Sequence, residues 1–170
     1  GRVVKSNHAD FAEGDYVSSS FGWREAFTAP VQGIEKLGEI VVAPSHYLGA
    51  IGMPGMTAYV GLLEVGALKD GETVYVSGAA GAVGSIVGQI AKIKGARVVG
   101  VCGSDEKGKV LTEKLGFDAA VNYKDANYRD ALKAAKPDGV DVYFDNTGGA
   151  ILGSALFRMN VGGRVACCGV

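Results

Sequence analysis

The sequence predicts an α/β fold built on a doubly wound parallel sheet, and three observations lead to this prediction. From residue 73 onward, short β-rich runs alternate with segments of helical periodicity. Several of the β-rich runs are almost wholly apolar, as in strands that are covered on both faces. A glycine-rich turn joins the first of these runs to the helix that follows it. Because crossovers between parallel strands are right-handed, we expect the strand order 3-2-1-4-5 of a Rossmann sheet.

Each element is predicted from its own local signals. The expected strands are 73–77, 96–102, 119–122, 140–145 and 164–169. The expected helices are 54–68, 82–94, 105–115, 127–135 and 149–159. Gly95 closes the second of these helices, Ser104 is placed to cap the third, and Pro137 stops the fourth.

The first 50 or so residues follow a different pattern. Tyr16–Ser20 and the run from Gly22 to Phe27 are β-like, and prolines and glycines then interrupt the chain up to Pro44. Such a segment is too short to form an independent core. The sequence also begins without an initiator methionine and stops at Val170, directly after an apolar strand. We therefore expect a fragment of a longer two-domain enzyme, in which the last strand of a six-stranded sheet is missing.

Composition excludes several function classes. The 17 basic and 18 acidic residues give a net charge of -1 with no basic stripe, so nothing favours a nucleic-acid partner. No run of about 18 apolar residues is present, so we expect no membrane span. The three cysteines, Cys102, Cys167 and Cys168, have no metal-ligand spacing and are a poor disulfide set. These features predict a soluble cytoplasmic protein.

The glycine-rich turn carries the main functional signal. Gly78 and Gly81 would allow the backbone to turn tightly and to approach a pyrophosphate, and Gly84 would let the next helix pack close to the strand. The backbone N–H groups at the start of that helix would face the negative charge. A dinucleotide coenzyme fits this turn best. Two alternatives stay open at this point, a methyltransferase that uses S-adenosylmethionine and a nucleotide-binding module without catalysis.

The end of the second strand favours NADP(H) over NAD(H). An NAD site usually places a carboxylate there, but residues 101–104 read Val-Cys-Gly-Ser. Lys107 follows one helical turn later, and Lys124 ends the third strand nearby. Both lysines could also be ordinary solvated side chains. Asp105 and Glu106 count against a phosphate site, although both could simply complement the helix N-terminus.

Several motifs then occur together in one order, and their combination is more specific than any one of them. They are Gly-Met-Pro-Gly-Met-Thr-Ala-Tyr at 52–59, Ala-Ala-Gly-Ala-Val-Gly-Ser at 79–85, Val-Gly-Gln-Ile-Ala-Lys at 87–92, Gly-Ser-Asp-Glu-Lys at 103–107 and Tyr-Phe-Asp-Asn-Thr-Gly-Gly at 143–149. With these motifs the chain resembles the zinc-independent medium-chain reductases of the leukotriene B4 12-hydroxydehydrogenase, prostaglandin reductase and alkenal double-bond reductase group.

The resemblance implies a set of positions that contact NADP(H). Those expected at the pyrophosphate are Gly81, Ala82, Val83 and Gly84, and those expected at the 2′-phosphate are Lys107 and Tyr123. Those expected on the nicotinamide side are Asn146, Cys168, Gly169 and Val170, with Met53 and Thr57 beside the bound cofactor. The catalytic proton donor would lie outside this chain.

The resemblance also implies an activity and a domain organisation. Hydride would pass from NADPH to the β-carbon of an α,β-unsaturated ketone or aldehyde, and a tyrosine or water would supply a proton to the α-carbon. Residues 1–50 would belong to a GroES-like substrate domain and residues 51–170 to the NADP-binding domain, and the parent enzyme would be a homodimer. The alternatives are an NADPH quinone oxidoreductase and a catalytically incompetent NADP-binding fragment.

Zinc alcohol dehydrogenases share the expected fold, but their ligand pattern is absent. No cysteine follows the Gly14-Asp15 turn and none lies in 48–57, so we expect no metal site. Cys167 and Cys168 are expected to pack in the core. Tyr59 is expected to pack against the sheet, and Asp145 to be a turn or cap residue rather than a catalytic base.

Overall fold

A computed structural model describes residues 1–135 and 138–169 of the chain. It contains two compact units, Gly1–Pro44 and Ser45–Val170. Each unit is described by itself below. Their assignment to a substrate domain and a coenzyme domain stays a prediction.

The first unit contains a small antiparallel sheet. Its strands are β1 (Val17–Ser19) and β2 (Ile34–Lys36), with Val17 opposite Lys36. The expected strand in the run from Gly22 to Phe27 is wrong, because β2 forms later, in the stretch expected to be irregular. Gly33 has a φ of +79°, and this turn conformation brings Ile34 alongside β1, whereas the Trp23 side chain is fully exposed.

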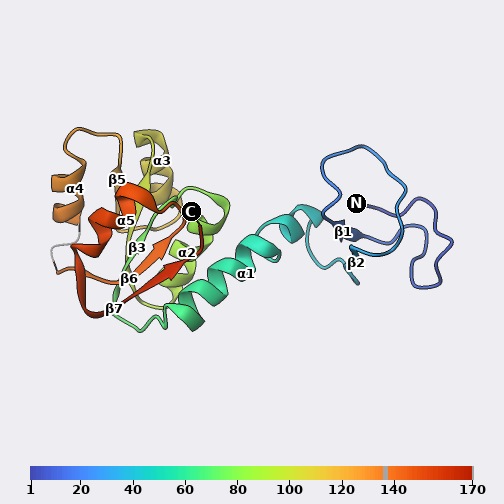
Figure 1. Ribbon diagram of the computed structural model, residues 1–170, viewed down its shortest axis with the longest axis horizontal. Helices are drawn as coiled ribbons and strands as arrows, with labels where there is room; N and C mark the ends of the chain where they lie inside the picture. Colours follow the sequence, from blue (N-terminus) through green and yellow to red (C-terminus); the bar gives the residue numbers. More distant parts are fainter. Residues whose placement is uncertain (136–137, 170) are drawn as a thin grey trace. The chain divides into compact units, whose positions relative to one another are not determined.

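The second unit is built on a five-stranded parallel sheet (Figure 1). Its strands are β3 (Thr73–Val76), β4 (Arg97–Cys102), β5 (Ala119–Asn122), β6 (Val140–Asp145) and β7 (Met159–Cys167). The strand order is β5-β4-β3-β6-β7 with parallel pairing throughout. This is the predicted order 3-2-1-4-5, so the fold prediction is confirmed.

Helices connect these strands. They are η1 (Pro44–Leu48), α1 (Met53–Tyr59), η2 (Val60–Val65), α2 (Ala82–Ile93), α3 (Asp105–Lys109), η3 (Val110–Lys114), α4 (Tyr128–Ala135) and α5 (Gly149–Leu156). The expected helices at 54–68 and 105–115 each begin as an α-helix and continue as a π-helical segment, η2 and η3. Ser104 caps α3 as predicted, because its Oγ accepts a hydrogen bond from Lys107 N at 3.3 Å. Pro137, the expected stop of α4, lies outside the described residues.

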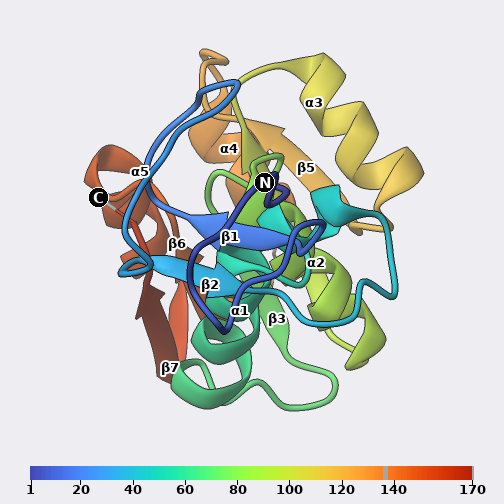
Figure 2. The ribbon, with the colours of Figure 1, turned by 90° about the vertical axis from the view of Figure 1, so that its right-hand side faces the viewer.

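Helices cover both faces of the sheet (Figures 1 and 2). One core contains side chains of α1, η2, α2 and η3, and the other contains side chains of α4 and α5. Gly88 shows how closely α2 approaches its neighbours, because a Cβ atom there would lie 1.9 Å from the Phe117 ring. Burial on both faces explains why the strands are nearly all apolar.

The last helix and strand differ from their expected bounds. Helix α5 ends at Leu156 rather than 159, and β7 begins at Met159 rather than 164. The pairing shifts between Val140 and Val142, which face Met159 and Arg164. An irregularity inside β7 therefore accommodates a polar and glycine-rich stretch that, in the sequence, resembles a loop.

Arg164 fastens β7 to the loop that precedes β3. Its guanidinium donates two hydrogen bonds to the Glu72 carboxylate, at 2.9 and 2.6 Å, and two more to the carbonyls of Gly66 and Ala67, at 2.9 and 3.0 Å. The hydrogen bonds from Arg164 hold the pKa of Glu72 below its ordinary value, although burial opposes them. This contact fixes the chain between η2 and the first strand of the sheet.

Candidate functional site

The sheet has its switch point between β3 and β6. From β3 the chain continues outward to β4 and β5, and it later returns to the other side of β3 as β6. In open α/β sheets, ligands bind in the crevice beyond the carboxyl ends of the strands at such a point. Here the segments that follow the two strands are 77–84 and 146–148.

The glycine turn after β3 has the geometry of a phosphate cradle. Gly78 has a φ of +57°, and a Cβ at Gly84 would lie 2.5 Å from Gly78 O. Glycine at position 84 therefore allows α2 to start directly against the turn. Gly81 is the N-cap of α2 and has no side chain to cap it, so the first-turn N–H groups are available to an anion. These features fit a pyrophosphate group.

A buried carboxylate ties the ends of β3 and β6 together. Asp145 is 2% exposed, and its Oδ1 accepts hydrogen bonds from Tyr143 OH at 2.6 Å and Ser77 Oγ at 2.9 Å. The same oxygen accepts from the backbone N–H groups of Gly148 and Thr147, at 2.9 and 3.1 Å. Burial alone would raise the pKa of Asp145, but these hydrogen bonds outweigh it and hold the pKa below its ordinary value. Asp145 is thus a turn residue, as predicted.

Sequence reasoning did not assign a role to Ser77 or Tyr143. The signal that could have revealed Ser77 is the parallel topology. Polar residues at the carboxyl ends of two neighbouring parallel strands lie at the same edge of the sheet: Ser77 directly follows β3, and Asp145 is the last residue of β6. Tyr143 is two residues before Asp145 on β6, so both side chains lie on the same face of the strand.

The ends of β4 and β5 lie side by side, because Cys102 pairs with Asn122. Lys107 is exposed in α3. Tyr123 is also exposed, and its ring lies close to Gly103, because a Cβ atom added at Gly103 would be 3.2 Å from that ring. The structure therefore places Tyr123 directly after β5 and Lys107 in the helix that follows the neighbouring strand β4.

Both acidic neighbours of Lys107 have local partners. Asp105 Oδ1 accepts a hydrogen bond from Asn122 Nδ2 at 2.9 Å. Hydrogen bonds from its own backbone N–H and from the Ser104 hydroxyl lower the pKa of Glu106. Both carboxylates therefore have hydrogen-bond partners close to the start of α3.

The predicted residues on the nicotinamide side follow β6 and β7. The backbone N–H groups of Cys168 and Gly169 both donate to Asp145 O, at 2.8 and 3.1 Å. A Cβ at Gly169 would lie 2.3 Å from Asn146 O, so the two segments are in close contact. Val170 lies outside the described residues. Both Cys167 and Cys168 are exposed, so their predicted core packing is wrong: the core position at this end of β7 belongs to Ala166.

Helix α1 packs beside α2 and exposes one face. Met53 is 71% exposed, and Thr57 Oγ1 donates to Met53 O at 2.8 Å. Tyr59 is 52% exposed, so the prediction that it packs against the sheet is wrong. Ala58 and Leu62 have the core positions on this part of the chain instead.

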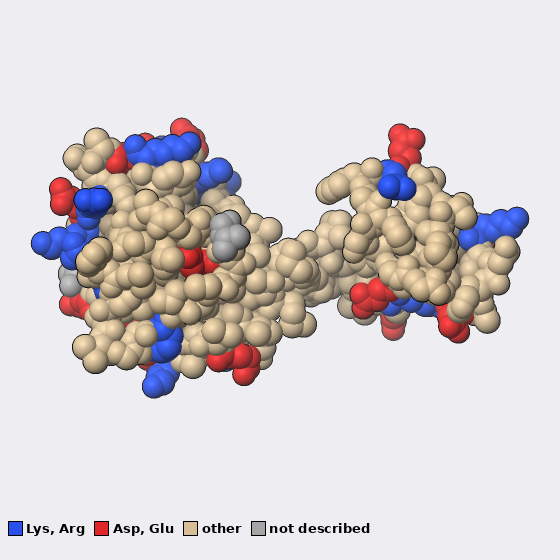
Figure 3. All heavy atoms as spheres, viewed as in Figure 1, with Lys and Arg blue, Asp and Glu red and all other residues tan. Residues whose placement is uncertain are grey.

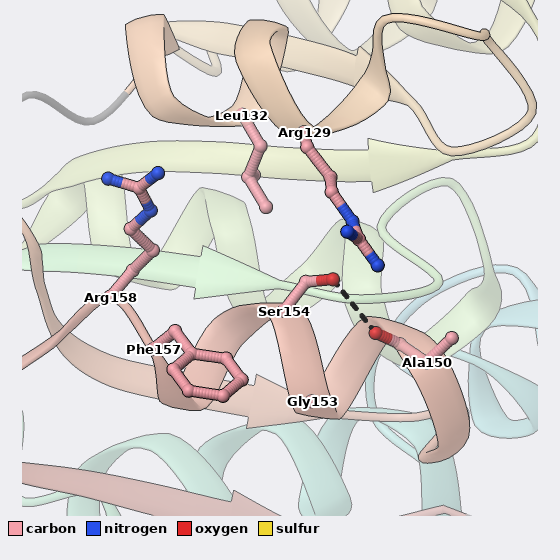
Figure 4. A pocket seen from close by; sticks show the side chains of 7 residues that line it. All are labelled: Arg129, Leu132, Ala150, Gly153, Ser154, Phe157 and Arg158. Carbon is pink, nitrogen blue, oxygen red and sulfur yellow. Dashed lines mark hydrogen bonds between the residues drawn. The ribbon is translucent and has the colours of Figure 1, made fainter.

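A separate pocket of about 380 Å³ lies between α4 and α5 (Figure 4). Its lining residues are Arg129, Leu132, Ala150, Gly153, Ser154, Phe157 and Arg158. The Ser154 hydroxyl is used within α5, where it donates to Ala150 O at 2.9 Å. None of the predicted site residues lines this pocket, and it has no buried charged group, so we assign the site to the switch point.

The distribution of surface charge and of metal-binding residue types does not identify a further candidate site in the part of the chain that the structure describes. Basic and acidic side chains are scattered over the face of the Ser45–Val170 unit in Figure 3, and neither sign forms a broad patch there. Over residues 1–135 and 138–169, no group of three or more His, Cys, Asp or Glu side chains is placed to hold a metal ion. None of the helices in the same residues is long and apolar enough to cross a membrane.

A family profile described as "Zinc-binding dehydrogenase" matches residues 82–170, just over half of the chain. The chain belongs to the zinc-binding dehydrogenase family. Within that family it falls in the medium-chain alkenal and prostaglandin reductase group, which confirms the resemblance stated above. The match begins at Ala82, the first residue of α2, and covers all the strands from β4 to β7.

Similar proteins include prostaglandin reductase 1 of Mus musculus, 49% identical over 174 residues, covering 99% of this chain and 52% of the relative. The NADP(+)-dependent 2-alkenal reductase of Nicotiana tabacum is 47% identical over 171 residues, covering 99% and 50%. Among solved structures, CurA of Vibrio vulnificus in complex with NADPH has a TM-score of 0.93 and 40% identity, covering 99% and 50%. The chain thus spans about half the length of these relatives.

Proposed function

We propose that the Ser45–Val170 unit binds NADP(H) at the switch point, and that the protein reduces the C=C bond of α,β-unsaturated ketones and aldehydes. The observation that carries this proposal is the uncapped start of α2 beside the glycine turn, combined with Lys107 and the absence of a carboxylate among residues 101–104 at the end of β4. The names of the relatives, a 2-alkenal reductase and a prostaglandin reductase, support the substrate class.

Each part of the coenzyme would have its own residues. The N–H groups of Ala82, Val83 and Gly84 would hold the pyrophosphate, and the Lys107 ammonium and Tyr123 hydroxyl the 2′-phosphate. Because β4 and β5 lie on one side of β3, the nicotinamide half would extend toward β6 and β7 on the other side. There it would meet Asn146, Cys168, Gly169 and Val170, with Met53 and Thr57 along its flank.

This placement separates the role of the coenzyme from the role of the chain. The coenzyme, when bound, supplies a hydride for the β-carbon of the substrate. The chain contributes orientation, because the β3–α2 turn and the 146–148 turn hold the two halves on either side of the switch point. We place the proton donor outside this chain.

Further features of the parent protein belong to the same proposal. We propose that residues 1–50 are part of a substrate domain, that the parent enzyme is a homodimer in the cytoplasm, and that it works without zinc. The absence of Cys donors in 48–57 supports the last point.

A coenzyme and substrate panel tests the proposed function. Oxidation of NADPH and NADH by the purified parent enzyme would be followed with a simple enal, an enone and a quinone, with and without a chelator; residues 1–170 alone should show little or no turnover. We expect turnover of the enal and enone, a preference for NADPH, and no effect of the chelator. Turnover of the quinone alone would favour a quinone reductase, and binding of NADPH without any turnover would favour a binding module.

A further inference from the structure

The contacts of Ser77 fix the orientation of the Asn146 side chain. Ser77 O lies 2.8 Å from the outer end of the Asn146 amide. Because a backbone carbonyl only accepts hydrogen bonds, the amide atom at this position must be Nδ2. The Asn146 Oδ1 is therefore the opposite end of the amide, and it accepts no hydrogen bond within the described residues.

The hydroxyl of Ser77 is oriented in the same way. Its Oγ accepts a hydrogen bond from Asn146 N at 2.8 Å, so its proton points to Asp145 Oδ1 at 2.9 Å. Tyr143 OH donates to the same carboxylate oxygen at 2.6 Å. Ser77 is fully buried and Asp145 is 2% exposed, so water does not compete for these contacts.

We propose that the Asp145, Ser77 and Tyr143 side chains form a positioning unit that fixes the turn carrying Asn146, so that the Asn146 side-chain amide, which is bonded to the Ser77 carbonyl, keeps its oxygen available to a ribose hydroxyl on the nicotinamide side of the coenzyme. This inference rests on the proposed function, because it needs a dinucleotide in the crevice. A ribose hydroxyl is a hydrogen-bond donor, and a fixed carbonyl oxygen is a suitable acceptor for it. The unit acts through Asn146, so its members are positioning residues.

The test compares NADPH with an analogue in which both hydroxyls of the nicotinamide ribose are replaced by hydrogen. Fluorescence titration gives the two Kd values for the wild-type protein and for Ser77→Ala and Asp145→Asn. Adenosine 2′,5′-bisphosphate, which lacks the nicotinamide half, is titrated in parallel. Ser154→Ala is the matched control, because it removes a partly exposed hydroxyl of α5 whose hydrogen bond within the described residues is to Ala150 O.

We expect the wild type and Ser154→Ala to bind NADPH roughly three- to tenfold more tightly than the analogue, the size of one or two ordinary hydrogen bonds. In Ser77→Ala and Asp145→Asn this ratio should fall toward one, because each change removes or weakens side-chain hydrogen bonds to the 146–148 main chain and so loosens the turn that carries Asn146. The affinity for the bisphosphate should stay at the wild-type value. A purely structural loss would instead weaken all three ligands together.

Other results overturn the inference in distinguishable ways. A ratio near one in the wild type contradicts it without any variant, so the test holds even if a variant fails to fold. An unchanged ratio in both folded variants also overturns it, while the proposed function stands. If the wild type binds neither NADPH nor the bisphosphate, the proposed function falls and the inference falls with it.

Discussion

At the scale of the residue, the contacts of its neighbours determine what Lys107 can do. Asp105 is bonded to Asn122, and Glu106 is held at the helix start by its own N–H and the Ser104 hydroxyl. Neither carboxylate forms an ion pair with Lys107 within the described residues, and we propose that the Lys107 ammonium binds the phosphate. The sequence shows these three charges only as a run, and their separate partners come from the fold.

Replacing Lys107 tests this reading. In Lys107→Ala the preference for NADPH over NADH should be erased, because a cation that bonds a phosphate contributes roughly ten- to a hundredfold in affinity. Titration with both coenzymes measures the preference. Lys114→Ala, which removes an exposed cation from η3, should keep it. Equal affinities for the two coenzymes in the wild type would contradict the assignment.

The ionisation of Asp145 makes the stability of the fold depend on pH. Its pKa in the folded state lies below the ordinary value of 3.8, so the ionised form stabilises the fold. This contribution is complete above about pH 5 and is lost as the pH falls through the folded pKa. Asp145→Asn should therefore lower Tm at neutral pH, and the gap between wild type and variant should narrow in acid. Thermal unfolding from pH 7 to pH 3 measures it, and a gap that is constant with pH would argue against an ionised Asp145.

At the scale of the element, substitution by alanine should have different effects at two helical glycines, Gly84 and Gly153. In Gly84→Ala the new Cβ would lie 2.5 Å from Gly78 O, so α2 must move away from the turn and NADPH binding should fall at least tenfold. In Gly153→Ala the new Cβ meets no atom within 4 Å beyond its chain neighbours and the backbone of its own helix, so binding should not change and stability should rise by about 0.5–1 kcal/mol. Coenzyme titration and urea unfolding measure both effects. Unchanged binding in Gly84→Ala would show that the close approach is not needed.

The Arg164 contact gives a stability prediction at the same scale. A lysine side chain ends in a single ammonium group. It therefore cannot reproduce the two hydrogen bonds to the Glu72 carboxylate together with those to the Gly66 and Ala67 carbonyls. Arg164→Lys should therefore lower the free energy of unfolding by about 1–3 kcal/mol in urea. The control is Arg158→Lys, because the Arg158 side chain contacts no acidic group within the described residues. Equal stability of the wild type and Arg164→Lys would contradict this role.

The elements also show what a sequence can and cannot predict. Strands β5 and β6 were predicted at their observed bounds, because buried parallel strands are continuous apolar runs between clear stops. The start of β7 was missed, since Asn160 and the following Val-Gly-Gly resemble a turn and only the pairing with β6 makes them a strand. The prediction of a strand in the run from Gly22 to Phe27 was wrong for a related reason, because an isolated β-like run forms a strand only where a partner is available.

At the scale of the whole molecule, the strand order brings the site together. Residues expected to contact one coenzyme are more than 110 positions apart in the sequence, from Met53 to Gly169, and the order β5-β4-β3-β6-β7 collects most of them at one edge of the sheet. Positions with a backbone role, such as Gly78 and Gly84, could be predicted from spacing. The Ser77–Asp145–Tyr143 contacts could not, because they depend on the register between β3 and β6.

The most direct test of the central claim is a crystal structure of the protein soaked with NADPH. We predict the pyrophosphate on the N–H groups of Ala82–Gly84, the 2′-phosphate beside Lys107 and Tyr123, and the nicotinamide half on the side of β6. A coenzyme bound elsewhere, with the β3–α2 turn empty, would contradict the account.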